Sequence, residues 1–254
     1  MERWHALFSN WAIITLLTII VICNFLAYFY NVLPLSNAIA LLLIPALLTL
    51  YFYRQRFMAN VFFSIFLLYF LGIIFQVFDN FALSTKLSES FLLGTYLMMI
   101  FVLLGSLKHI KFEGVVSWYL IIVLLVNAYL MYAMFSNVQD NFMDSVILTL
   151  AVCKGIALLI MGFVAFAVNL SQETSQSILF LSIVCCFVFA DVLSFTTTVY
   201  VQFWLFESFH NILQGLGLFM LCIYVFNHQQ LSKDEFLKER RKSLNNSNHL
   251  TIQS

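Results

Sequence analysis

The chain has 254 residues, of which 63% are hydrophobic and 9% are charged, whereas a typical soluble domain has about 25% charged residues. Its formal net charge is zero and no block of basic residues interrupts the apolar runs. This composition excludes a soluble catalytic domain, gives no indication of a nucleic-acid partner, and makes membrane lipid the expected surroundings.

Apolar runs that are long enough to cross a bilayer recur along nearly the whole chain. A hydrocarbon core about 30 Å thick requires roughly 20 helical residues, because each residue adds 1.5 Å. The expected fold is therefore an all-α membrane protein, a bundle of eight transmembrane helices within residues 1–227. The predicted spans are 11–31, 38–54, 58–80, 90–107, 115–136, 144–168, 177–199 and 203–227.

The two ends of the chain are interpreted differently. The first span has no small-residue cleavage site and exceeds the apolar core of a signal peptide, so we expect a retained helix. Residues 228–254, which include KDEFLKERRK, are polar and predict a cytoplasmic helix extension that becomes partly disordered. The basic residues of this tail could also contact anionic lipid headgroups.

The distribution of basic residues predicts the orientation, because Lys and Arg of short loops stay on the cytoplasmic side. With eight spans, the tail and the loops on the amino-terminal side hold ten of the twelve basic residues. The opposite side has Lys86, and Lys154 lies inside the sixth span. We therefore expect both termini in the cytoplasm and the chain in a plasma or inner membrane.

Polar side chains inside the spans are the candidate functional residues. A charge at the bilayer centre costs about 2.5–3.5 kcal/mol, so such a residue usually faces the bundle interior. Helical spacing and depth allow these side chains to converge in the outer half of the bundle. The candidates are Gln76 and Asp79 of the third span, Lys154 of the sixth, Asp191 of the seventh, and Glu207, His210 and Gln214 of the eighth.

Each candidate also has a structural interpretation that the sequence leaves open. Asp79 could reach water from a helix end, and Asp191 could form a structural ion pair with Lys154. The polar residues of the eighth span could be interhelical hydrogen-bonding groups. Collectively, two carboxylates, an amine and an imidazole at similar depth favour a functional site.

Two further patterns concern the organisation of the chain. Phe78-Asp79 before Ser84, and Ala190-Asp191 before Ser194, form a faint repeat that suggests two four-helix halves with a site between them. The five cysteines all lie in apolar runs, and no CxxC or Cys/His spacing occurs. We therefore expect neither disulfides nor a metal, and no cofactor.

The pattern resembles the YhhN-like lysoplasmalogenase family of eight-helix membrane hydrolases, over residues 1–227. The third-helix aspartate of the family falls on Asp79 and the seventh-helix aspartate on Asp191, within FADVLSF. The eighth-helix glutamine falls on Gln214, within HNILQ, where His210 replaces a tyrosine, and the family proline falls on Pro45. The chain departs from the family at Ile44 (lysine), Phe78 (glycine), Ala190 (serine) and Ile100 (histidine).

The resemblance implies hydrolysis of the vinyl-ether bond of a lysophospholipid-type substrate, with Asp79 and Asp191 as the catalytic pair. That reaction requires an acid to protonate the alkene carbon and a base to activate water. Asp191 is the expected acid and Asp79 the expected base, and a pairing of Lys154 with Asp191 reverses these roles. The expected substrate-binding residues are Gln76, Lys154, Glu207, His210 and Gln214.

Other functions are also compatible with the sequence. The chain could be a relative that keeps the lipid pocket without the chemistry. It could instead be a proton-coupled transporter that uses Asp79, Asp191 and Lys154 as titrating groups. Few glycines and prolines, eight and two, argue against the transporter, because broken helices are common around transporter sites. A membrane sensor with a basic cytoplasmic tail is a third hypothesis.

Overall fold

A computed structural model describes residues 19, 22, 23, 26, 27, 30, 33–54, 58–78, 83–106, 115–136, 144–172, 174–199 and 203–251. This part of the chain contains seven long helices and no strand, which confirms an all-α protein. The first predicted span lies mostly outside the described residues, so these helices correspond to the second to eighth spans. They are α3 (Leu33–Arg54), α4 (Asn60–Val77), α5 (Ser84–Ser106), α6 (Val115–Ser136), α7 (Ser145–Gln172), α8 (Ser175–Val199) and α9 (Trp204–Thr251).

Six of the described helices are long and apolar enough to cross a membrane, and α6 holds a shorter apolar stretch, Ile121–Ala133. The chain is therefore an integral, multi-pass membrane protein, as the composition predicts. The six candidate spans are Ser36–Tyr53, Asn60–Val77, Ser84–Gly105, Ser145–Gln172, Ser175–Thr197 and Trp204–Gln229.

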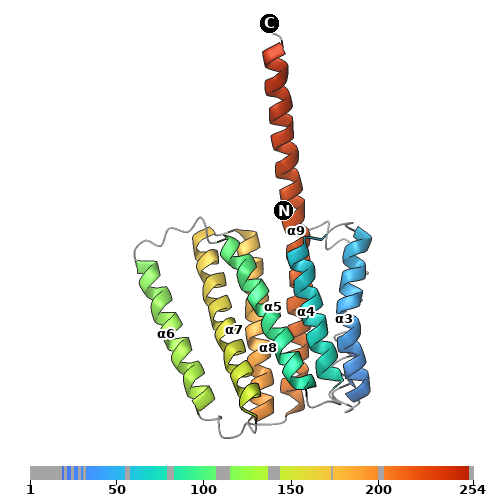
Figure 1. The fold of residues 1–254 in the computed structure, drawn as a ribbon, viewed down its shortest axis with the longest axis vertical. Coiled ribbons are helices and arrows are strands. Elements are labelled where there is room, and N and C mark those ends of the chain that lie inside the picture. Colours follow the sequence, from blue (N-terminus) through green and yellow to red (C-terminus); the bar gives the residue numbers. More distant parts are fainter. Residues whose placement is uncertain are drawn as a thin grey trace.

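The helices stand side by side, and α9 extends far beyond the bundle (Figure 1). Helices α3 and α6 lie at opposite edges in this view, and α4, α5, α7, α8 and α9 lie between them. At 1.5 Å per residue, the 48 residues of α9 span about 72 Å, more than twice a hydrocarbon core. The tail predicted from residue 228 onward thus continues the last transmembrane helix.

The central helices pack tightly around buried aromatic and aliphatic side chains. Tyr69 of α4, Tyr96 of α5 and Phe187 of α8 are among the largest fully buried residues. Gly72 permits the close approach of α4 and α5, because a Cβ there would lie 3.0 Å from Leu92 Cγ. This packing fixes the relative positions of the helices that carry the polar residues.

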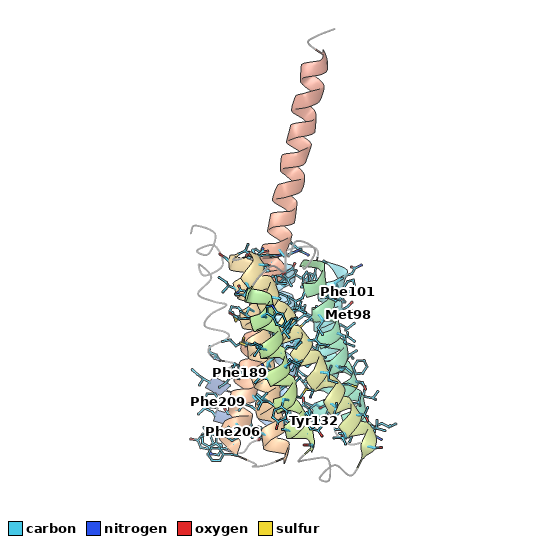
Figure 2. The ribbon with its side chains drawn as sticks, turned by 90° about the vertical axis from the view of Figure 1, so that its left-hand side faces the viewer. Met98, Phe101, Tyr132, Phe189, Phe206 and Phe209 are labelled. Carbon is cyan, nitrogen blue, oxygen red and sulfur yellow. The ribbon has the colours of Figure 1, made fainter. Side chains whose placement is uncertain are left out.

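The outer surface of the bundle is also apolar. The four side chains Phe101 of α5, Tyr132 of α6, Phe189 of α8 and Phe209 of α9, labelled in Figure 2, are all exposed. Helices that are apolar on every face are typical of a membrane environment, because lipid covers the outward side chains.

One helix boundary differs from its prediction in a way that matters for the site. Helix α5 begins at Ser84, whereas the predicted fourth span begins at residue 90. The polar segment before residue 90 suggested a loop, but its side chains are accommodated in the helix. Ser88 Oγ donates a 2.9 Å hydrogen bond to the Gly72 carbonyl, and Lys86 Nζ lies 2.6 Å from Asp144 Oδ2.

Candidate functional site

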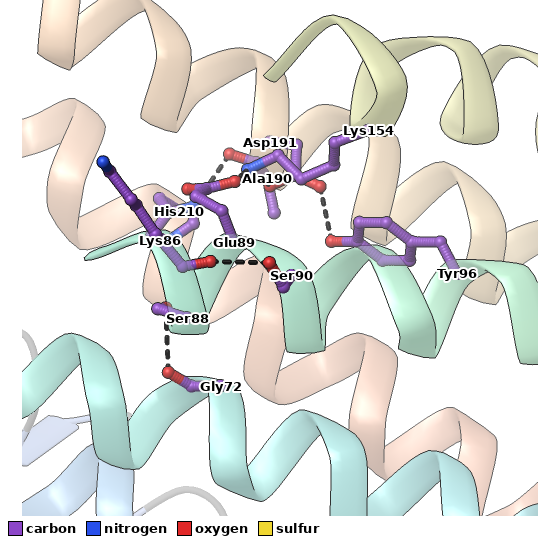
Figure 3. A network of polar contacts seen from close by, with 10 residues as sticks. All are labelled: Gly72, Lys86, Ser88, Glu89, Ser90, Tyr96, Lys154, Ala190, Asp191 and His210. Atoms are coloured by element: carbon purple, nitrogen blue, oxygen red, sulfur yellow. Dashed lines mark hydrogen bonds and ion pairs between the residues drawn. The ribbon is translucent and has the colours of Figure 1, made fainter. Parts of the chain in front are cut away.

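An intramembrane lysine contacts two carboxylates from two other helices (Figure 3). Lys154 Nζ of α7 lies 2.7 Å from Glu89 Oε2 of α5 and 3.6 Å from Asp191 Oδ1 of α8. The side chains of Lys154, Glu89 and Asp191 are 16%, 24% and 7% exposed. We call these three residues the buried ion cluster. The ion pair of Lys154 with Asp191, which the sequence leaves open, is present in the structure, and Glu89 is an additional partner.

Asp191 is the most deeply buried member of the cluster. The Tyr96 hydroxyl donates a short hydrogen bond to Asp191 Oδ2, while Oδ1 faces the Lys154 ammonium. One oxygen therefore accepts from a hydroxyl and the other lies near a cation, an arrangement that suits a carboxylate. Glu89 and Tyr96 lie two turns apart on α5, so both project from one face of that helix.

His210 of α9 joins this region through the backbone next to Asp191. Its Nδ1 lies 2.7 Å from the Ala190 carbonyl oxygen, and the residue is buried. Because a carbonyl can only accept, Nδ1 carries the hydrogen and donates it. The predicted position of His210 near Asp191 is thereby confirmed, and the contact links α9 to α8.

These residues lie at similar depths from the same end of the bundle, which we call the Ser84 end. Helices α5, α7 and α9 begin at this end and α8 finishes there (Figure 1). Counted at 1.5 Å per residue, Glu89, His210, Asp191 and Lys154 lie about 8, 9, 12 and 14 Å from their helix ends. The predicted convergence of Lys154, Asp191 and His210 in one half of the bundle is therefore observed.

A second tyrosine, Tyr69 of α4, contacts the same phenylalanine as Tyr96. The rings of Tyr69 and Tyr96 both contact Phe187, with centroids 5.8 and 6.1 Å away. Phe187 precedes Asp191 by about one turn of α8, so it lies on the same helix face. Among the described residues, the buried Tyr69 hydroxyl has no hydrogen-bond partner.

A half-buried ion pair joins α5 and α7 at the Ser84 end. Lys86 Nζ lies 2.6 Å from Asp144 Oδ2, and the Val146 amide donates a 2.9 Å hydrogen bond to Asp144 Oδ1. Asp144 therefore caps α7 and binds α5 at the same time. The hydrogen bond from Lys86 holds the pKa of Asp144, which precedes the span, below its ordinary value.

The other predicted site residues do not join the cluster. Gln76 and Glu207 are exposed on their helices, and Gln214 is half-buried. In the described part of the chain, no hydrogen bond or ion pair links these three side chains to the buried ion cluster. Asp79 lies outside the described residues, so its separation from Asp191 stays a prediction.

Two site residues, Glu89 and Tyr96, were missing from the sequence candidates. Glu89 lies one residue before the predicted fourth span, so it counted as part of a loop. Tyr96 lies in the middle of an apolar run, where an aromatic residue usually serves packing. A signal was available, because the spacing of seven between these two residues places them on one helix face.

The described residues contain no group of three or more His, Cys, Asp and Glu side chains that could hold a metal ion. The site contains ionisable groups: two carboxylates, an ammonium, a tyrosine hydroxyl and an imidazole. Such groups bind and transfer protons and stabilise a cation. Comparison of the chain with known protein families, with curated proteins and with solved structures finds no match.

Proposed function

We propose that the protein is a membrane hydrolase that cleaves the vinyl-ether bond of a lysophospholipid-type substrate, as YhhN-like lysoplasmalogenases do. The observation that supports this most is the environment of Asp191. This aspartate, to which the family resemblance assigns a catalytic role, is buried and lies between Tyr96 and Lys154 inside the bundle. A carboxylate fixed in this way can act on a lipid that enters from the membrane.

The ion pair supports one of the two role assignments that the sequence leaves open. Because Lys154 lies beside Asp191, the proposal assigns Asp191 as the base and Asp79 as the acid. In the proposed reaction, Asp79 protonates the alkene carbon and the resulting oxocarbenium ion lies near the Asp191 and Glu89 carboxylates. Asp191 then takes a proton from the water that adds to this cation. The hemiacetal formed breaks its bond to the glycerol oxygen, which yields a fatty aldehyde and a free hydroxyl.

The proposal includes the arrangement of the bundle in the membrane. It places eight helices in two four-helix halves, with Asp79 and Asp191 in equivalent positions and both termini in the cytoplasm. The Ser84 end then faces outward. In support, Lys86, in the first turn of α5, is the basic residue at that end, whereas the basic tail follows the apolar part of α9 at the other end.

A direct assay tests the activity. The full chain, purified in detergent, is incubated with a 1-alkenyl lysophospholipid, and released aldehyde is measured. We expect release by the natural chain and none by Asp191→Asn or Asp79→Asn, provided that both variants elute as folded protein. Asp144→Asn is the matched control, since Asp144 lies outside the buried ion cluster and its loss should leave release unchanged.

One observation also favours a second function, a proton-coupled transporter. The buried ion cluster contains three ionisable side chains within candidate spans, and such groups often mark proton paths. A transporter would take up its substrate into liposomes when a pH gradient is applied and would form no covalent product. Uptake without aldehyde would therefore replace the hydrolase with this function.

A further inference from the structure

The hydroxyl of Tyr69 is a buried polar group that the proposed reaction does not use. Tyr69 lies in the middle of α4 and is 0% exposed. Within the described part of the chain, its hydroxyl has no hydrogen-bond partner. Because a buried polar group without a partner is costly, such groups in proteins normally bind an ordered water or a ligand atom. The Tyr69 hydroxyl is therefore free to bind a small polar molecule inside the bundle.

Depth and packing place this hydroxyl near Asp191. Counted at 1.5 Å per residue, Tyr69 of α4 and Asp191 of α8 both lie about 12 Å from their helix ends at the Ser84 end. The ring of Tyr69 packs against Phe187, which precedes Asp191 by about one turn of α8. The Asp191 carboxylate is close enough to interact electrostatically with the Tyr69 hydroxyl, but the two groups form no hydrogen bond. A polar pair at such a separation is typically bridged by water.

The polar groups that meet here suit a water molecule. A buried water needs two to four polar partners. The Tyr69 hydroxyl has a donor and an acceptor available, and a carboxylate can accept about four hydrogen bonds. Of these, the Tyr96 hydroxyl supplies one at Asp191 Oδ2, and the Lys154 ammonium lies 3.6 Å from Oδ1. Asp191 therefore keeps acceptor capacity for a water that Tyr69 also contacts.

We propose that Tyr69 binds the water that adds to the oxocarbenium ion and holds it against Asp191, an inference that rests on the proposed hydrolase function. One hydrogen of this water is donated to the Asp191 carboxylate and the other to the Tyr69 oxygen. The water oxygen forms the bond to the cationic carbon and its proton passes to Asp191, while Tyr69 keeps its own hydrogen. Tyr69 is thus a further catalytic residue, which the packing of its ring against Phe187 holds in place.

Competition between water and methanol for the cation tests this role. The full chain in detergent receives a 1-alkenyl lysophospholipid in buffer that contains methanol, and mass spectrometry measures fatty aldehyde and mixed methyl acetal. Methanol adds through its oxygen, loses its proton to Asp191 and leaves an acetal in place of the hemiacetal. The natural chain should give mainly aldehyde, because water is already bound at the cation. Tyr69→Phe should raise the ratio of acetal to aldehyde about fivefold, the factor that corresponds to one ordinary hydrogen bond.

The matched control is Tyr224→Phe, the same substitution at another buried tyrosine. The Tyr224 ring contacts Phe62 and Phe180, and the residue lies about 30 Å from the Ser84 end of α9. Its product ratio should equal that of the natural chain. Since Tyr69→Phe removes none of the hydrogen bonds of the described residues, the variant should remain folded, which gel filtration checks.

The two proposals fail in different ways. If folded Tyr69→Phe forms aldehyde and acetal in the same ratio as the natural chain, Tyr69 does not hold the water, and the hydrolase function stands without it. If the natural chain forms neither product, the hydrolase function fails, and the role of Tyr69 fails with it.

Discussion

Replacement of Lys154 by methionine is the perturbation whose energetic effect follows most directly from the geometry. Methionine keeps much of the length of the side chain and removes its charge, so both carboxylates lose their cation. At an effective dielectric constant of about 20, the attractions across 2.7 and 3.6 Å are about 6 and about 5 kcal/mol. Desolvation of the ions offsets much of this gross energy, and the removal of one partner from a buried pair typically costs about 3–5 kcal/mol.

A loss of that size corresponds to a fall in Tm of roughly 6–20 °C for a chain of this length. The assay is thermal unfolding of purified Lys154→Met in detergent, followed by the loss of the folded gel-filtration peak. Lys86→Met is the matched control, because the pair of Lys86 with Asp144 is about one third exposed at the end of the bundle, and the Tm of this variant should stay close to that of the natural chain.

A second variant tests whether charge imbalance, rather than a lost packing contact, causes the loss. Lys154→Met combined with Glu89→Gln and Asp191→Asn removes all three charges, so it should recover a large part of the Tm. If Lys154→Met were as stable as Lys86→Met, the lysine would not lie between the two carboxylates and the reasoning would fail.

Three further predictions follow from other contacts. Asp144→Ala should lower Tm more than Asp144→Asn, because asparagine still caps α7, and equal Tm values for the two variants would contradict the capping role. In the natural chain, the stability that the ion pair of Asp144 with Lys86 contributes should be lost as pH falls through the lowered pKa of Asp144. Tyr96→Phe should destabilise the protein by about 1–3 kcal/mol, whereas Tyr69→Phe should be neutral, and chemical denaturation that ranks them in the opposite order would be inconsistent with the hydrogen bond to the carboxylate. Gly72→Ala should lower the free energy of unfolding by about 1–3 kcal/mol through overpacking against Leu92. A Cβ at Gly105 would have no neighbouring atom within 4 Å, so Gly105→Ala should not lower it, and a comparison of the two Tm values checks this.

The membrane class and most helix positions could be predicted from the sequence, because long apolar runs have few other solutions in lipid. The pairing of Lys154 with Asp191 was also accessible. Each is a charge within an apolar span, and their depths, counted from the span ends, bring them together. Both inferences use properties of one helix at a time, namely the length of its apolar run and the depth of a charge along it.

What could not be predicted depends on contacts between helices. The polar start of α5 suggested a loop because Lys86 and Ser88 are costly in a span unless they have partners. Their partners, Asp144 and the Gly72 carbonyl, lie on other segments and are known only from the fold. With the helix start misplaced, Glu89 was excluded from the candidate residues.

The spacing of polar residues along a helix also could not predict which of them are exposed. Gln76 and Glu207 fit polar stripes on their helices, yet both are exposed, because the rotation of a helix is set by its packing against neighbours. Tyr96 shows the converse. Its sequence context is that of a packing residue, and only the position of α8 beside α5 makes its hydroxyl a donor to Asp191.

The proposed function requires that Asp191 act as the base, and product formation is the most direct measurement of this role. Fatty aldehyde is quantified by mass spectrometry after a 1-alkenyl lysophospholipid is mixed with the purified natural chain or with Asp191→Asn. We expect aldehyde from the natural chain and only background from the variant. Equal amounts from both proteins, or no aldehyde from a folded natural chain, would contradict it.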